Sequence, residues 1–206
     1  MAVINSATRE MQFKIVYYGP AMGGKTTNLL QLHDHVPVPQ KDKNKLVSLA
    51  TSSDRTLFFD FLPIEAMAIK GFKTKIQVYT VPGQVIYDAT RKLVLRGVDG
   101  IVFVADSQYE KMNENVESFE NLEENLKSIE LPLTDLPYVL QYNKRDLPTA
   151  APLEYMEFLL NDRDVQVPSF PAVAQRCEGI FESLNMITRM LLSKYIPRLK
   201  LVARCA

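Results

Sequence analysis

The residues best suited to phosphate chemistry lie in one short stretch, Gly19 to Thr26, which reads GPAMGGKT and fills every fixed position of the pattern G-x-x-x-x-G-K-[ST]. The stretch follows an apolar run that favours a buried strand, residues 13–18, and precedes a helical run, residues 26–35. In that context backbone N–H groups and a helix N-terminus converge on one anion. The alternative is a glycine turn beside a surface lysine. It would require the motif, the preceding strand and the following helix to occur together by chance. The pattern predicts phosphate contacts at Gly19, Ala21, Met22, Gly23, Gly24, Lys25, Thr26 and Thr27, with Mg²⁺ on the Thr26 hydroxyl.

A second motif, Asn143 to Asp146 (NKRD), indicates which base accompanies the phosphates, because ATPases, kinases and GTPases share the first motif. Asp146 can accept hydrogen bonds from both N–H groups on the Watson–Crick edge of guanine. Adenine presents the opposite polarity there and would leave a buried carboxylate unpaired. Asn143 can tie the base loop to the phosphate loop, and the Lys144 stem can cover the ring. A surface turn is the bland alternative, and a kinase is disfavoured because no second-substrate site is visible.

The elements around these motifs predict an α/β fold of the phosphate-loop NTPase kind. Strands that alternate with helices imply right-handed crossovers, a mostly parallel sheet with helices on both faces, and a ligand at the carboxyl ends of the strands. We expect one antiparallel hairpin, which turns near Gly71. The predicted strands are 13–18, 46–50, 57–62, 74–80, 99–106, 137–142 and 167–173, and the predicted helices are 26–35, 88–96, 110–129, one after Pro152, and 179–195.

The predicted domain organisation is one domain, residues 1–195, followed by a C-terminal tail, residues 196–206. The tail alternates basic and apolar residues, and Pro197 is expected to end the last helix before it. A solvated end fits this composition better than a segment that docks on a partner. Between Glu110 and Ile129 the apolar residues recur at helical spacing, which predicts core packing.

Composition argues against several classes of function. Lys and Arg together number 24, as do Asp and Glu, so no overall field attracts nucleic acid or an anionic membrane. Two cysteines, Cys177 and Cys205, with no metal-binding spacing, suit a reducing cytoplasm. No secretory signal, membrane span or lipidation motif is visible, so we expect a cytoplasmic protein with no membrane insertion and no nucleic-acid partner.

The chain resembles the Ras superfamily of small GTPases and, within it, the bacterial MglA-type polarity GTPases. The resemblance runs from about Asn5 to the last helix and rests on the two motifs above together with residues 14–20, 55–61 and 79–84. Most small GTPases begin the segment before the switch glycine with Asp, whereas Thr80 holds that place here, as is typical of the MglA group. This departure weakens any expectation of a carboxylate near Mg²⁺.

The resemblance assigns the remaining roles by position. It implies GTP/GDP and Mg²⁺ as cofactors, with Thr56 as the switch threonine that completes the metal site together with Thr26. Gly83 matches the switch glycine that senses the γ-phosphate, and Gln84 matches the glutamine that orients the attacking water. Arg55 matches an arginine supplied in cis to neutralise transition-state charge. The last guanine-contacting segment is loosely matched by Val173, Ala174 and Gln175, where the Ala174 N–H would meet the guanine carbonyl.

The resemblance also implies a function in the control of cell polarity or motility, with recruitment to a cell pole. The implied partners are a roadblock-type (MglB-like) GTPase-activating protein and a response-regulator-like or repeat-protein effector. One departure matters: Ala21 stands where small GTPases normally have Gly, and its methyl group would occupy space needed by Gln84 and an arginine finger. Two hypotheses therefore remain, a GTP-hydrolysing switch and a nucleotide-fixed scaffold with negligible turnover.

Overall fold

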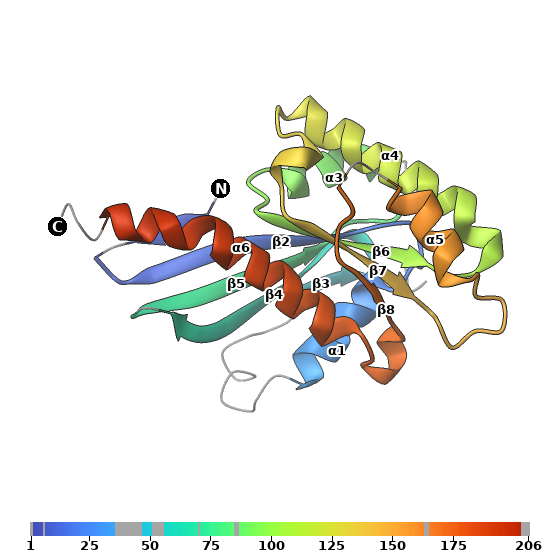
Figure 1. The fold of residues 1–206 in the computed structure, drawn as a ribbon, viewed down its shortest axis with the longest axis horizontal. Helices are drawn as coiled ribbons and strands as arrows, with labels where there is room; N and C mark the ends of the chain where they lie inside the picture. The colour runs from blue at the N-terminus through green and yellow to red at the C-terminus, as the bar shows by residue number, and fades with distance from the viewer. Residues whose placement is uncertain are drawn as a thin grey trace.

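One mixed sheet forms the centre of the molecule, with helices on both of its faces (Figure 1). The structure, a computed structural model, describes residues 2–5, 7–35, 47–50, 56–69, 71–84, 87–162 and 165–202. Of residues 47–50, 56–63, 65–69 and 196–202 it describes the backbone alone. The predicted α/β class with a mostly parallel sheet is confirmed.

The strands are β1 (Val3–Asn5), β2 (Glu10–Tyr18), β3 (Val47–Ala50), β4 (Thr56–Ile69), β5 (Phe72–Thr80), β6 (Gly100–Asp106), β7 (Tyr138–Asn143) and β8 (Ser169–Pro171). The α-helices are α1 (Lys25–His35), α3 (Asp88–Leu95), α4 (Met112–Ser128), α5 (Leu153–Leu160) and α6 (Ile180–Val202). Short 3₁₀ segments are η2 (Tyr109–Lys111), η3 (Leu133–Asp135) and η4 (Ala174–Arg176).

The strand order is β3-β4-β5-β2-β6-β7-β8, and β1 pairs with β2 off this path. Strands β5, β2, β6, β7 and β8 are parallel to their neighbours in this run. The register pairs Tyr18 with Phe103 and Asp106 with Asn143, so the ends of β2, β6 and β7 meet along one edge of the sheet. Both sequence motifs begin at that edge, which is where a parallel sheet presents its ligand.

Alternating residues of the central strands face two separate cores. On β6, Ile101 and Phe103 face the layer formed by α3, α4 and α5, whereas Val102 and Val104 face the layer formed by α1 and α6. Figure 1 shows α6 crossing the sheet on the face opposite α4. Four residues of the predicted apolar stripe on α4 are buried in the first core: Met112, Phe119, Leu122 and Leu126. Core packing is therefore the confirmed role of that stripe.

The hairpin expected at Gly71 is present as the antiparallel pair β4 and β5, but β4 is longer than predicted. The prediction ended this strand before Pro63, and the structure continues it to Ile69. In the described part of the chain β3 pairs with β4 no further than Phe61, so Pro63 lies where β4 is an edge strand. An edge tolerates a residue without an N–H group.

The predictions for the last strand and the last helix were wrong at their ends. Helix α6 continues past Pro197 to Val202, although a proline inside a helix removes one hydrogen bond at a cost of roughly 3 kcal/mol. Strand β8 is shorter than predicted and begins only after Pro168, which cannot donate to a ladder. The division between a domain ending at residue 195 and a tail stays a prediction.

Three further elements differ from the sequence prediction. The predicted helix 110–129 begins as the 3₁₀ turn η2, and α4 proper starts at Met112. Strand β2 begins at Glu10, because Met11, Phe13 and Ile15 alternate into the core. Strand β1 was not expected, since three residues are too few to show the alternation of apolar and polar residues that predicts a strand.

Candidate functional site

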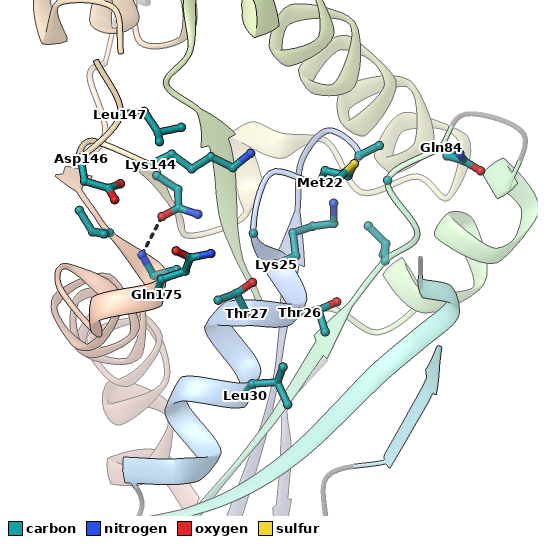
Figure 2. Close-up of a pocket in the computed structure, with 17 residues that line it drawn as sticks. Met22, Lys25, Thr26, Thr27, Leu30, Gln84, Lys144, Asp146, Leu147 and Gln175 are labelled. Atoms are coloured by element: carbon teal, nitrogen blue, oxygen red, sulfur yellow. Dashed lines mark hydrogen bonds between the residues drawn. The ribbon is translucent and has the colours of Figure 1, made fainter. Parts of the chain in front are cut away.

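The phosphate loop connects the end of β2 to the start of α1 and curls around the Lys25 side chain. The Lys25 ammonium donates to the carbonyl oxygens of Gly19 (3.0 Å) and Pro20 (2.6 Å). The residue is 6% exposed, so its charge is held at the centre of the loop. Figure 2 shows the side chain rising from α1 into the loop. A cation fixed there, at a helix N-terminus, makes a strong site for an anion.

Two glycines of this loop are required by its geometry. Gly19 has φ +141°, and a Cβ on it would lie 2.1 Å from the carbonyl oxygen of Val104. Gly24 has φ +99°, and a Cβ on it would lie 2.1 Å from Nδ2 of Asn143. Any side chain would therefore push the loop away from β6 or from the second motif.

Asn143, at the end of β7, joins three segments of the site. Its side-chain amide donates to the Gly23 carbonyl (2.8 Å), and its Oδ1 accepts from the Ala174 N–H (2.9 Å, the dashed line in Figure 2). The predicted tie between the base loop and the phosphate loop is thus present. The expected contact of the Ala174 N–H with the guanine carbonyl stays a prediction, since in this structure the N–H donates to Asn143. Ala174 still lines the cavity described below.

Two ion pairs hold the charged residues of the second motif. Lys144 has φ +64°, and its ammonium lies 2.6 Å from Oδ2 of Asp106, a carboxylate that is completely buried at the end of β6. Asp146 lies 3.7 Å from Nη2 of Arg176, a side chain that is 62% exposed on η4. The Lys144 ammonium is therefore fixed by the buried Asp106 carboxylate. Asp146, by contrast, is paired with a solvent-exposed arginine that would compete with a bound base for the carboxylate.

A cavity of about 660 Å³ lies between the two motifs (Figure 2). Asp146 and Gln84 lie at opposite ends of this cavity. Most of the predicted site residues line it: Ala21, Met22, Gly24, Lys25, Thr26, Thr27, Gly83, Gln84, Asn143, Lys144, Asp146, Val173 and Ala174. Gln175, the third residue of the expected guanine-contacting segment, lines it as well. Residues missed by the sequence analysis also line it: Leu30, Val81 and Leu147. Leu147 directly follows the predicted residue Asp146, which is the one signal that could have pointed to it.

The remaining predicted residues do not line this cavity. Gly19 and Gly23 are buried residues of the phosphate loop itself, where they shape its backbone. Thr56 begins β4 opposite Ala50, and its side chain lies outside the described residues. Arg55 lies outside them altogether. The cis-finger and metal-threonine assignments therefore stay predictions.

The switch glycine lies directly on the phosphate loop. A Cβ on Gly83 would lie 2.3 Å from Cα and 2.5 Å from the backbone nitrogen of Ala21. Only glycine allows this approach, since every other residue would force the two backbones apart. Ala21 is thus a direct neighbour of the segment that carries Gln84.

The donors present suit a nucleotide and a hard cation. The loop offers backbone N–H groups and a buried ammonium, which match phosphates, and Asp146 at the far end matches a base with N–H donors. Among the described residues no cluster of three or more His, Cys, Asp or Glu side chains could hold a metal. The expected Mg²⁺ ligands are hydroxyls, and Mg²⁺ commonly completes its shell with water and phosphate oxygens.

The described helices include none long and apolar enough to cross a membrane.

Comparison with known proteins places the chain among related sequences. A family model described as "ADP-ribosylation factor family" matches residues 1–191. The chain is also 52% identical over 194 residues to "Mutual gliding-motility protein MglA" of Myxococcus xanthus (strain DK1622). That alignment covers 94% of this chain and 97% of the relative.

Proposed function

The chain belongs to the ADP-ribosylation factor family and is a small GTPase of the Ras superfamily, and on that premise we propose that its cavity binds GTP and GDP with Mg²⁺. The observation that carries this proposal is the pair of hydrogen bonds made by the Asn143 side chain. They join a phosphate loop, a guanine-type motif and η4 around one cavity of about 660 Å³. A mononucleotide has its phosphates and its base at opposite ends, as these residues require.

In the proposed complex Lys25 and the backbone N–H groups of residues 21–26 hold the phosphates. Thr26 and Thr56 hold Mg²⁺, which neutralises charge on the phosphate oxygens. Asp146 selects guanine by accepting hydrogen bonds from its two N–H groups. Guanine displaces Arg176 from Asp146, because an ion pair with an exposed arginine contributes little free energy. Gln84 orients the attacking water, and Arg55 stabilises the developing charge.

We further propose that the two nucleotide states control cell polarity and motility through partners that read only one of them. The high identity to a protein named for gliding motility supports this assignment. The proposed regulator is a roadblock-type GTPase-activating protein, and the proposed effector is a response-regulator-like or repeat protein that recruits the chain to a cell pole. Hydrolysis would end each cycle by releasing the switch segments around Thr56 and Gly83.

Titration calorimetry tests the binding step. With Mg²⁺ present, GDP and a non-hydrolysable GTP analogue should bind, and ADP should bind at least a hundredfold more weakly, because adenine leaves Asp146 unpaired. Lys25→Ala should abolish most of the affinity, whereas Lys127→Ala, at an exposed lysine on α4, should not change it. Equal affinities for ADP and GDP would refute the assignment of the base.

A further inference from the structure

The guanidinium of Arg91, on α3, is completely buried between the switch segment and α4. Its Nε donates to the carbonyl oxygen of Pro82 at 2.9 Å, and its Nη2 donates to the carbonyl oxygen of Gly83. Its Nη1 donates to Oδ1 of Asn121 on α4 and, at 3.5 Å, to the hydroxyl of Tyr18 at the end of β2. Two of its four acceptors are therefore main-chain groups of the switch.

The other partners fix the guanidinium rigidly. Tyr18 donates to Asn121 (2.7 Å), and Asn125 donates to both Tyr18 (3.1 Å) and Asp88 (2.7 Å). Burial opposes ionisation of Asp88, but hydrogen bonds from Lys92, Asn125 and Asn121 outweigh it and lower the pKa of the carboxyl below its ordinary value. The carboxylate stays charged near neutral pH and balances the buried cation through these amides.

Two carbonyl groups on one cation set the direction of two N–H groups. The described peptide bonds are all trans, so each N–H points opposite to the carbonyl in the same peptide plane. The Pro82 carbonyl shares its plane with the Gly83 N–H, and the Gly83 carbonyl shares its plane with the Gln84 N–H. Since both carbonyls face Arg91, both N–H groups face away from it.

The direction of these two N–H groups matters because Gly83 lies against the phosphate loop. Its backbone contacts Ala21 in the phosphate loop, so a small rotation of either peptide plane changes how the switch meets that loop. A buried guanidinium that lost its carbonyl acceptors would be left unsatisfied, which is costly for a charged group out of reach of water. Arg91 therefore resists such a rotation.

We propose that Arg91 is a positioning residue that orients the N–H groups of Gly83 and Gln84, and so determines how strongly the site prefers a triphosphate over a diphosphate. The inference rests on the proposed role of Gly83 as the γ-phosphate sensor. Arg91 itself does not line the nucleotide cavity. Its loss should weaken binding of GTP and leave the binding of GDP, which lacks the γ-phosphate, nearly unchanged.

The test compares affinities for GDP and for guanosine 5′-(β,γ-imido)triphosphate by calorimetry with Mg²⁺. Arg91→Met should weaken the triphosphate analogue about tenfold or more, roughly 1.4 kcal/mol, and change GDP affinity less than about twofold. Arg91→Lys should recover part of the loss, because an ammonium can reach one carbonyl but not both in a fork. Arg96→Met, at an exposed arginine beyond the end of α3, is the matched control and should change neither value.

Asn121→Ala is the second variant. It removes the acceptor on α4 that fixes Nη1 of Arg91, and it keeps the arginine side chain in place. It should weaken the triphosphate analogue severalfold and spare GDP, and it decides the question if Arg91→Met does not fold. Equal losses for both nucleotides, or no loss for either, would overturn the positioning role. If wild-type protein bound neither nucleotide, the proposed function would fail instead, and the two failures are thereby distinct.

Discussion

Replacing Asn143 by alanine removes the side chain that holds the two halves of the site together. Its amide donates to the Gly23 carbonyl and accepts from the Ala174 N–H, and the residue is 2% exposed. The variant leaves one acceptor and one donor of the backbone buried without these partners. It also separates the phosphate loop from the base loop before any ligand binds.

The magnitude follows from those two groups. Each buried backbone group left unsatisfied costs about 1–3 kcal/mol, so Asn143→Ala should lower the free energy of unfolding by about 2–6 kcal/mol. Domains are commonly stable by about 5–15 kcal/mol, so a domain near the middle of that range remains folded after this loss. GDP binding must bring the separated phosphate loop and base loop together again. If this costs about 2 kcal/mol of binding free energy, GDP affinity should fall about 30-fold.

Urea unfolding without nucleotide measures the first quantity, and calorimetry with GDP measures the second. Asn113→Ala, at an exposed position on α4, is the control and should change the free energy of unfolding by less than about 0.5 kcal/mol. Asn143→Asp is informative as well, because it keeps the acceptor for Ala174 but turns a carboxylate oxygen towards the Gly23 carbonyl. It should bind GDP no better than Asn143→Ala. An Asn143→Ala protein with wild-type stability and GDP affinity would refute the reasoning.

Three further predictions concern specificity and hydrolysis. Asp146→Asn should weaken guanine nucleotides and improve xanthine nucleotides, since an amide donates to the extra carbonyl of xanthine; competition binding with GDP and XDP checks this, and an unchanged preference would contradict it. Lys25→Ala should weaken nucleotide binding itself, whereas Gln84→Ala should leave affinity nearly intact and slow single-turnover hydrolysis by a hundredfold or more, on the usual scale for a group that acts in the transition state. Ala21→Gly should raise the rate of hydrolysis stimulated by a roadblock-type partner about tenfold, or roughly 1.4 kcal/mol of barrier, because it frees space beside Gly83 and Gln84; equal rates would show that the methyl group is tolerated.

The parts of the site that a short pattern encodes could be predicted from the sequence. The phosphate loop and the Asn143–Asp146 motif combine fixed residue types at fixed spacing with a strand that ends just before them. Parallel strands present their carboxyl ends along one edge, so the meeting of the two motifs follows from the fold class alone. The apolar stripe of α4 is similarly visible, because helical periodicity is local.

The remaining features depend on contacts between distant segments. The pairing of Lys144 with buried Asp106 joins two strand ends, and neither residue signals the other in the sequence. The burial of Arg91 is equally hidden, since an arginine on an amphipathic helix is usually solvated. The end of α6 was missed because Pro197 is a strong local signal for a helix end, and the structure carries the helix past it to Val202.

Single-turnover hydrolysis is the most direct test of the central account, a guanine-specific GTPase whose catalytic glutamine lies at the far end of the cavity from Asp146. The wild-type chain should be mixed in excess with γ-labelled GTP or ATP and Mg²⁺, and phosphate release followed for several hours, because intrinsic rates of small GTPases are on the order of 10⁻⁴ s⁻¹. The account predicts that the wild type releases phosphate from GTP at least about a hundredfold faster than the Gln84→Ala protein, and that neither releases it from ATP above buffer. Equal release from GTP and ATP, or GTP that stays bound and intact in the wild type, would contradict it.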